Sequence, residues 1–208
     1  MEYEVRYYYS NNELNNIIEK LSQIKELKNK KRIYEKTIQY DHPNENNSFY
    51  TKEIDGRFRI RISKNESISK CMISWKRRLN KKSEVNQEEE KELTIKYDEY
   101  ENLIFIIENI LKMKKTESYE RYRTVFYNDE IEIAVDEYPF GIALEIENKS
   151  KSNNPKEIVK KWVEKLDLDI NKSYKLSWDD KYTELCKEQN IEIFKHVTFD
   201  KIMPKIKE

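Results

Sequence analysis

The feature that most constrains this fold is a series of short segments in which charged and apolar residues alternate. In residues 57–62, three arginines alternate with Phe58, Ile60 and Ile62. Successive side chains of a β-strand point to opposite faces, so such a segment has one charged face and one apolar face. The pattern recurs, and we expect strands at residues 1–9, 31–41, 70–79, 90–97, 118–127, 130–136 and 142–147 as well.

The charges on these faces are sorted by sign from strand to strand. Residues 57–61 and 121–123 place only arginines on the charged face, whereas 132–136 and 145–147 place only carboxylates there. The ordinary interpretation is an antiparallel sheet whose charged side faces water. A solvated face, however, usually mixes the two signs. If amphipathic helices cover the apolar faces instead, about eight strands can close into a barrel with the charges inside.

Helices are expected between and after the strands. Leu14, Ile17, Ile18 and Leu21 repeat at helical spacing within 11–28, and a second apolar stripe occupies 98–113. Further helices are expected from Pro155, over 178–186 and near the C-terminus, while 49–63 resembles a hairpin turning near Asp55 and Gly56, and 80–89 a polar connection. The prediction is an α+β fold in one domain, 1–208. Its tunnel strands and two helices lie in 1–147, and a helical part follows in 148–208.

Composition excludes several classes of function. The chain has two glycines, which rules out a glycine-rich phosphate loop, so any phosphate must be bound by side chains. Two cysteines and two histidines do not make a typical zinc site. Forty basic and forty acidic residues give no net charge, unlike most duplex-binding proteins. No apolar run is long enough for a membrane span and no signal peptide is visible, so we expect a cytoplasmic protein without membrane contact.

A lumen lined with this many charges must be wet, because burying ions in a dry interior costs several kcal/mol each. Opposed basic and acidic walls would focus the electric field between them. The occupant that fits is a polyanion on the basic wall, bridged by hard cations to the acidic wall. Arginine binds phosphate through paired donors, and carboxylates suit Mg²⁺ or Mn²⁺.

At this point the ordered motifs resemble the CYTH superfamily, the triphosphate tunnel metalloenzymes. Glu2, Glu4 and Arg6 are similar to its N-terminal ExExK signature, with arginine in place of the commoner lysine. The remaining motifs follow in order: Arg57-Phe-Arg59-Ile-Arg61, Lys76, the acidic Glu90 and Glu92, Arg121-Tyr-Arg123, and Asp136 through Gly141 to Glu145-Ile-Glu147. The resemblance covers about residues 1–147. It implies an eight-stranded tunnel that holds a triphosphate and Mg²⁺ or Mn²⁺.

The resemblance also implies roles for individual residues. Metal would be held by Glu2, Glu4, Asp136, Glu145 and Glu147. Phosphates would be bound by Arg6, Arg57, Arg59, Arg61, Lys76, Arg78, Arg121 and Arg123. Lys76, Glu2 and Glu4 are the expected catalytic residues. Glu90, Glu92 and Glu132 complete the acidic wall without an assigned role.

Four functions are compatible with such a tunnel. The first is metal-dependent hydrolysis of tripolyphosphate, thiamine triphosphate or a nucleoside triphosphate. The second is cyclisation of ATP, as in class IV adenylyl cyclases, which releases pyrophosphate. The third is removal of phosphate from an RNA 5′-end, the one case with a nucleic-acid partner, and the fourth is a non-catalytic polyphosphate or nucleotide module. The expected partner is therefore a small triphosphate, and the chain is expected to be a monomer or homodimer.

Overall fold

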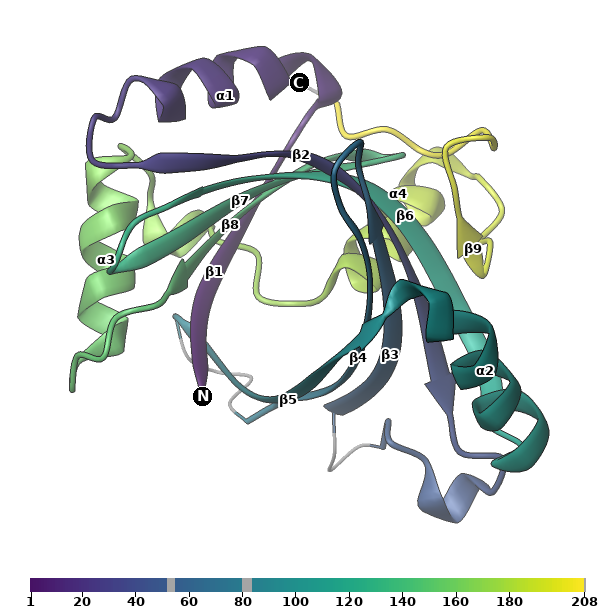
Figure 1. Cartoon of the computed structure of the whole chain (residues 1–208). Coiled ribbons are helices and arrows are strands. Elements are labelled where there is room, and N and C mark those ends of the chain that lie inside the picture. The colour runs from purple at the N-terminus through teal and green to yellow at the C-terminus, as the bar shows by residue number, and fades with distance from the viewer. Residues whose placement is uncertain (52–54, 80–83, 208) are drawn as a thin grey trace.

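Eight antiparallel strands close into a barrel in the computed structural model, which describes residues 1–51, 55–79 and 84–207. Around the barrel the order is β2-β3-β4-β5-β1-β8-β7-β6, and pairing of β6 with β2 completes the ring (Figure 1). The predicted closed eight-stranded α+β barrel is thus confirmed. Its strands are β1 (Glu2–Tyr9), β2 (Lys28–Asp41), β3 (Asp55–Lys64), β4 (Ser69–Arg78), β5 (Asn86–Lys96), β6 (Lys114–Tyr127), β7 (Ile131–Tyr138) and β8 (Gly141–Asn148).

Two long strands make the closure possible. The strands β2 and β6 each have 14 residues and pair along most of their length. The register shifts between Lys30 and Ile33 and again between Gln39 and Tyr40. Such irregularities bend and twist a strand, which a barrel requires. In the strand order of the ring, β2 and β6 lie opposite β1 and β5.

Two helices cover the outer faces of β1, β7 and β8. The helices α1 (Leu14–Ser22) and α3 (Pro155–Lys165) lie on this side of the barrel in Figure 1. Trp162 of α3 is 1% exposed and Ile133 of β7 is fully buried. Both residues belong to one cluster of packed apolar side chains, the largest in the described chain. Its other buried members include Val5, Tyr7, Leu21, Ile131, Val135, Leu144, Ile146, Val159 and Val163. The apolar strand faces therefore point outward, toward helices.

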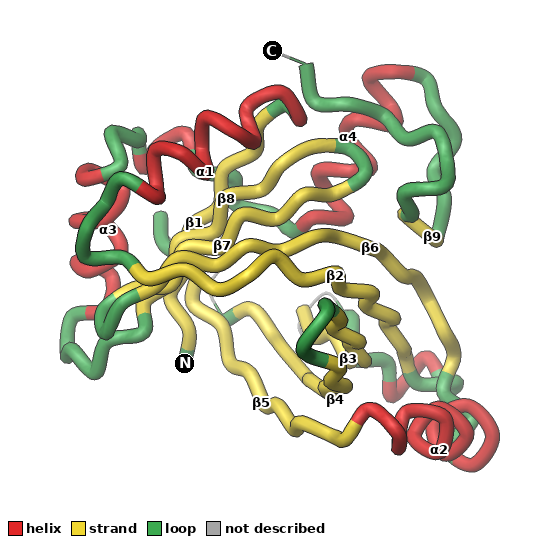
Figure 2. The backbone as a smooth tube through the Cα atoms, turned by 45° about the horizontal axis from the view of Figure 1, so that its top comes forward, coloured by secondary structure: helices red, strands yellow, loops and turns green. Residues whose placement is uncertain are grey.

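The other two helices cover the rest of the ring. The helix α2 (Tyr100–Phe105) follows a 3-10 turn and continues into a π-helical turn, Ile106–Ile110; together they pack on Ile38 and Ile60. The helix α4 (Trp178–Gln189) packs on Tyr138 and Phe140. In Figure 2 all helices lie outside the ring of strands. No helix in the described ranges is long and apolar enough to cross a membrane.

The hairpin predicted to turn near Asp55 and Gly56 is displaced by a few residues. Tyr50 and Asp55 form an antiparallel bridge, and Gly56 donates its backbone N–H to the carbonyl of Phe49, so the chain reverses before Asp55. Asp55 and Gly56 themselves are the first residues of β3 and pair with Arg78 and Arg77 of β4. A second hairpin joins β3 to β4, where Asn65 accepts backbone hydrogen bonds from Ser67 and Ile68. Residues 52–54, within the predicted hairpin, lie outside the described part, as do residues 80–83 of the predicted polar connection.

Helix lengths and the C-terminus also differ from expectation. The first helix ends at Ser22 instead of near Lys28, and the stripe in 98–113 yields only a short α-helix with turns at both ends. The helix expected near the C-terminus is absent from the described residues. Asn190 adopts a left-handed conformation that ends α4, and the following chain forms β9 (His196–Val197), parallel to β6. In this segment Val197, Met203 and Pro204 are buried, a spacing that does not make a helical face.

Candidate active site

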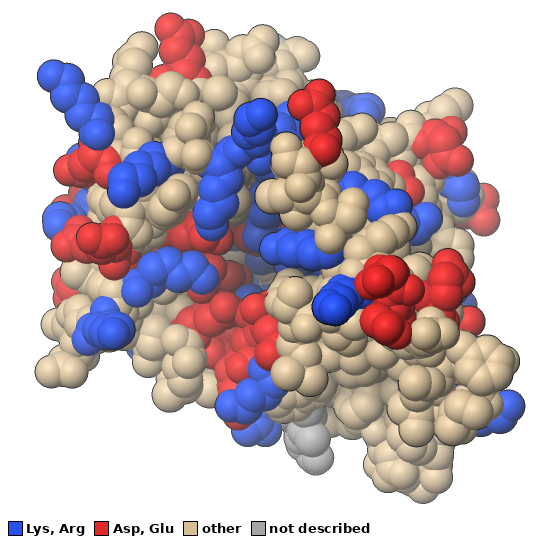
Figure 3. Space-filling view, viewed as in Figure 1, with Lys and Arg blue, Asp and Glu red and all other residues tan. Residues whose placement is uncertain are grey.

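The barrel encloses a cavity of about 510 Å³, within the roughly 300–1,000 Å³ common for small-molecule sites. Its lining is made of the inward side chains of the strands. Figure 3 looks into this hollow, with acidic side chains gathered on one side and basic side chains above and beside it. Of the residues predicted for the site, all line this cavity except Asp136, which is fully buried behind it. The charged faces therefore do point inward.

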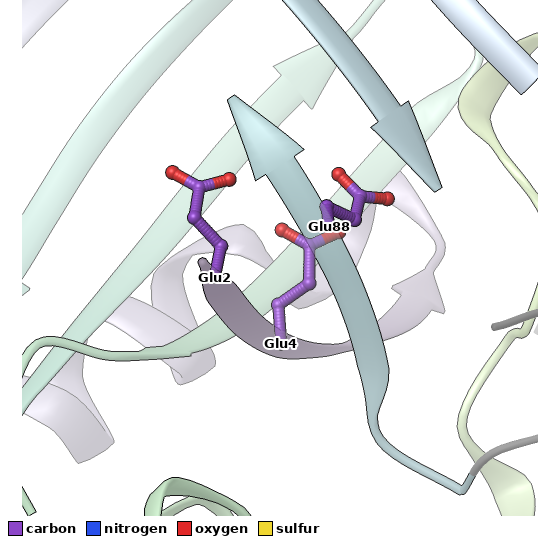
Figure 4. Close-up of side chains that lie close together, drawn as sticks. All are labelled: Glu2, Glu4 and Glu88. Carbon is purple, nitrogen blue, oxygen red and sulfur yellow. The ribbon is translucent and has the colours of Figure 1, made fainter. Parts of the chain in front are cut away.

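Three carboxylates meet on the acidic wall. Glu2 and Glu4 come from β1, and Glu88 comes from β5, where it pairs directly with Glu2 (Figure 4). One oxygen of each lies within 4.8 Å of the others. The ammonium of Lys76 on β4 joins them: its Nζ lies 2.7 Å from an oxygen of Glu2, 2.7 Å from Glu88 and 3.6 Å from Glu4. We call Glu2, Glu4 and Glu88 the acidic triad.

The carboxylates of the acidic wall have strongly shifted pKa values. Burial raises the pKa of Glu90 to about 8, helped by its hydrogen bond with Glu2. The pKa of Glu2 is lowered to about 2, because Lys76 and the same hydrogen bond outweigh the opposing effect of burial. Burial and the charge of Glu2 also raise the pKa of Glu147 to about 8. The wall thus holds more carboxylates than Lys76 and Lys149 neutralise, which is the electrostatic condition for binding a divalent cation.

The basic wall faces the triad and comes mainly from β3 and β6. Arg57, Arg59 and Arg61 alternate along β3, and Arg121 and Arg123 along β6. These arginines differ in how far they are already neutralised. The buried Nε of Arg59 has no hydrogen-bond partner, and burial with the nearby Arg57 and Arg61 lowers its pKa. A phosphate oxygen at this position would supply the missing acceptor.

Arg121 and Arg123 are held by buried carboxylates. Arg121 donates two bonds to Glu35, at 2.9 and 2.7 Å, and one to Asp136 at 2.7 Å. Arg123 donates two bonds of 2.6 Å to Asp136 and one to Glu145. Both oxygens of Asp136 accept from arginine, so in this arrangement Asp136 orients the basic wall. Its predicted role as a metal ligand stays a prediction.

Arg6 connects the two walls. Its Nε donates to Glu145 at 2.8 Å and its Nη2 lies 3.3 Å from an oxygen of Glu4. Arg6 and Arg123 lower the pKa of Glu145 well below its usual range, against the effect of burial. Glu145 is therefore ionised and held between two guanidinium groups. It lines the cavity, as does Glu147, and the metal-binding roles predicted for both stay predictions.

One end of the cavity is closed by the start of α4. Tyr119, Ser177 and Trp178 line this end, which we call the floor. Arg57 donates to the hydroxyl of Ser177 at 3.1 Å and to Asp55 at 2.8 Å. Arg57 also lines a second, smaller hollow of about 230 Å³ together with Glu117 and Asp179. The ion-paired Arg57 therefore stands between the cavity and this smaller hollow.

The remaining predicted residues line the cavity with other partners. Arg78 lies 3.5 Å from Glu88 and 4.0 Å from Asp55, so its positive charge stabilises the carboxylate of Glu88. Glu132 accepts a hydrogen bond from Lys30 at 3.2 Å. Glu92 lines the cavity beside them and pairs along the sheet with Ser74. Glu92 and Glu132 thus add less buried carboxylates to the cavity lining.

Two central residues were missed from the sequence. Glu88 lies in 80–89, which was assigned to a connection, yet it has the same parity as Glu90 and Glu92; extending the predicted strand back to Asn86 would have placed it on the inner face. Glu35 lies in a correctly predicted strand and alternates with Thr37 and Gln39 toward the inside. A parity analysis of that strand would have placed Glu35 on the same face as Thr37, Gln39 and Asp41.

The acidic triad fits a divalent metal by its donor chemistry. Its ligand atoms are carboxylate oxygens, which Mg²⁺ and Mn²⁺ prefer. The ammonium of Lys76, within 2.7 Å of two of these oxygens, shows that a cation is accommodated between them. Glu147 adds a further carboxylate to the same wall, beside Glu2.

Comparison with known proteins finds likeness in three dimensions. No protein-family model and no curated protein sequence matches this chain. Among solved structures, the PH1819 protein of Pyrococcus horikoshii has a TM-score of 0.65 and 26% identity, covering 91% of this chain and 99% of that chain. HpAC1 of Hippeastrum, a candidate adenylyl cyclase with a dominant triphosphatase activity, has a TM-score of 0.58 and 17% identity, covering 93% and 98%.

A candidate adenylate cyclase from Vibrio parahaemolyticus also shares the fold, with a TM-score of 0.63 and 15% identity, covering 86% of this chain and 95% of that chain. These likenesses show a shared fold, and the closed eight-stranded barrel is the architecture that the sequence motifs implied. The fold of this chain is therefore consistent with the resemblance to the CYTH superfamily.

Proposed function

We propose that this protein hydrolyses a triphosphate in a divalent-metal-dependent reaction inside the barrel. The proposal rests on the two opposed walls of one cavity. The acidic triad lies on one side, and on the other lie arginines that include Arg59, whose buried Nε has no hydrogen-bond partner. A chain of phosphates bound to the arginines lies within reach of a cation on the triad. The dominant triphosphatase activity of the structural neighbour HpAC1 agrees with this assignment.

The position of each residue in the cavity indicates its role in the proposed reaction. Arg59 and Arg61 bind phosphoryl oxygens near the floor, and Arg121 and Arg123 are held rigidly for the same purpose by Glu35 and Asp136. Such fixed donors stabilise the charge that develops on a transferring phosphoryl group. Glu2, Glu4 and Glu88 would hold Mg²⁺ or Mn²⁺, with Glu147 beside them. When bound, the metal polarises a phosphoryl oxygen and activates water.

Lys76 has a double role in this arrangement. Its ammonium neutralises the acidic triad, and the charges of Glu4 and Glu2 raise its pKa above the usual lysine range despite its burial. Lys76 is therefore protonated at neutral pH and acts as a phosphate-binding cation, not as a base. Because Lys76 lines the cavity, its ammonium can bind a phosphoryl oxygen of the substrate.

The test compares two adjacent glutamates of β5 that face opposite sides of the sheet. Glu88 belongs to the triad, whereas Glu89 pairs with Arg77 at 2.9 Å outside the cavity. With Mg²⁺ or Mn²⁺ and either tripolyphosphate or ATP, Glu88→Gln should lower kcat/KM at least about tenfold. Glu89→Gln should stay within about threefold, since surface substitutions change little.

Separation of the products distinguishes the reactions. Release of inorganic phosphate supports the hydrolase. Formation of cyclic AMP with pyrophosphate from ATP would replace it with a cyclase, as the name of the Vibrio parahaemolyticus neighbour suggests. Equal loss in both variants, with circular dichroism showing that both are folded, would contradict a role for the triad. Turnover of neither substrate by the unmodified protein would contradict the proposed reaction.

A further inference from the structure

Tyr119 occupies the floor of the cavity and has no role in the proposal above. It is 3% exposed, and its ring centroid lies 4.3 Å from that of Trp178 at the start of α4. Tyr119 pairs with Thr37 of β2, which in turn pairs with Arg61 of β3. The three side chains therefore stand side by side on the inner face of three neighbouring strands. The phenol shares a hydrogen bond with Thr37.

The surroundings of the phenol are strongly basic. Arg59 and Arg61 approach from β3 and Arg121 from β6, and the Nε of Arg59 has no partner. Glu35, the nearest carboxylate of β2, is bound to Arg121 and lies 3.8 Å from Arg61. Further titratable or charged groups on the packed elements include Glu117 and Arg123 on β6, Tyr138 on β7, Asp179 and Asp180 on α4, Arg57 on β3 and His196 on β9.

We propose that the Tyr119 hydroxyl binds the innermost phosphoryl group of the substrate, and that its ionised form competes with that group for Arg59 and Arg61. This inference rests on the proposed function. As a neutral phenol, Tyr119 donates a hydrogen bond to a phosphoryl oxygen already held by arginine. As a phenolate, it places a negative charge where the phosphate must bind, and it satisfies the arginines itself. The floor thus carries an internal anion that appears only after one proton is lost.

The phenol of Tyr119 ionises within a pH range that binding experiments can cover. Burial alone would raise the pKa of Tyr119, but Arg121, Arg59 and Arg61 lower it to about 8. The phenol therefore donates a hydrogen bond at neutral pH, and affinity for a polyanion falls as pH rises through about 8. By linkage, a bound polyanion must in turn raise the pKa of the phenol.

Other groups ionise in the same pH range, so their effect on polyanion affinity must be separated from that of Tyr119. The pKa values of Glu90 and Glu147 are raised to about 8, and burial with the charge of Asp179 raises that of Glu117 to about 7. Their ionisation also repels a polyanion as pH rises. They are unchanged in Tyr119→Phe, so the difference between the variant and the unmodified protein isolates the phenol.

The experiment measures tripolyphosphate binding by calorimetry at pH 6.5 and pH 9, with chelator and without metal. At the lower pH, Tyr119→Phe should bind about two- to tenfold more weakly, the usual effect of one lost hydrogen bond. Between the two pH values the unmodified protein should lose about tenfold more affinity than the variant, because its phenol ionises and the variant has none. Tyr40→Phe is the matched control: Tyr40 is a buried tyrosine outside the tunnel, bonded to Glu108. Its pH dependence should equal that of the unmodified protein.

A second measurement uses the unmodified protein alone. Its tyrosinate absorbance should show one group that ionises near pH 8, and tripolyphosphate should move that midpoint upward. Equal pH dependence in Tyr119→Phe and the unmodified protein, or a midpoint that tripolyphosphate leaves in place, would overturn the inference even if hydrolysis is observed. Binding with the predicted pH dependence but no turnover would instead contradict the proposed reaction and leave the inference intact.

Discussion

Glu35 is the residue on which the geometry of the basic wall most depends. It is 5% exposed, and its carboxylate accepts from Ser63 as well as from Arg121. Burial would raise its pKa, but Arg121 and Arg61 lower it well below the usual carboxylate range. A depressed carboxylate pKa contributes stability that is fully present above the unfolded value near 4.5 and is lost as pH falls through the folded value. Glu35 is therefore ionised throughout the neutral range.

Neutralising Glu35 should destabilise the fold and make it dependent on anions. Glu35→Gln leaves Arg121 and Arg61 without their shared counter-ion, and breaking such a buried pair costs about 3–5 kcal/mol. The loss in free energy of unfolding, measured with urea, should shrink when tripolyphosphate is added, because the anion replaces the missing charge. Glu157→Gln, a surface glutamate 3.9 Å from Lys160, should cost at most about 0.5 kcal/mol. A loss that tripolyphosphate does not reduce would argue against this role.

At the scale of elements, alternation in the strands was enough to predict most of the barrel, and it failed where local composition changes. The arginines of β3 were placed on the correct face because Phe58 and Ile60 alternate with them. The start of β5 could not be found, since Asn86, Gln87 and Glu88 are all polar and no apolar residue marks the outer face. The helix predicted near the C-terminus is wrong, because the buried residues of that segment are not spaced as one face of a helix.

The start of α4 shows how one element serves both fold and site. Ser177 immediately precedes the helix, and Asp180 accepts a hydrogen bond of 3.0 Å from its backbone N–H. The same serine hydroxyl accepts from Arg57, so the helix start and the basic wall share one side chain. Sequence analysis could predict the helix but not its position across the end of the tunnel. That position depends on the packing of Trp178 against Tyr119, two residues far apart in the chain.

Removing the Ser177 hydroxyl should therefore affect stability and binding together. Ser177→Ala loses the side chain at the helix N-terminus, which should lower the free energy of unfolding by about 1 kcal/mol. It also frees Arg57 from one of its anchors, so tripolyphosphate affinity should fall about two- to tenfold, as for one lost hydrogen bond. Ser22→Ala, at the end of α1, should change stability by at most about 0.5 kcal/mol and leave affinity unchanged. Loss of stability with unchanged affinity in Ser177→Ala would separate the helix start from the site.

At the scale of the whole molecule, the chain has no net charge, but its charges are separated across the cavity. Helices cover the apolar outer faces, and this forces the charged faces together around a cavity of about 510 Å³. The acidic wall is then crowded enough that Glu90 and Glu147 hold protons up to a pKa of about 8. For a carboxylate, a raised folded pKa means that stability is lost as pH rises from about 4.5 toward 8. The crowding of carboxylates on the acidic wall therefore destabilises the folded state at high pH, and a bound cation can relieve this.

Magnesium should accordingly stabilise the protein more at high pH than at low pH. Metal binding requires ionised carboxylates, so at pH 6 it must displace protons from Glu90 and Glu147, whereas at pH 8.5 most of these protons are already gone. Each proton displaced costs up to about a factor of ten in affinity per pH unit below its pKa. The shift in Tm on adding Mg²⁺, measured by scanning calorimetry against a chelator blank, should be larger at pH 8.5. Glu4→Gln should remove the shift at both pH values, and Glu89→Gln should keep it. An equal or larger shift at pH 6 would mean that Mg²⁺ binds away from this wall.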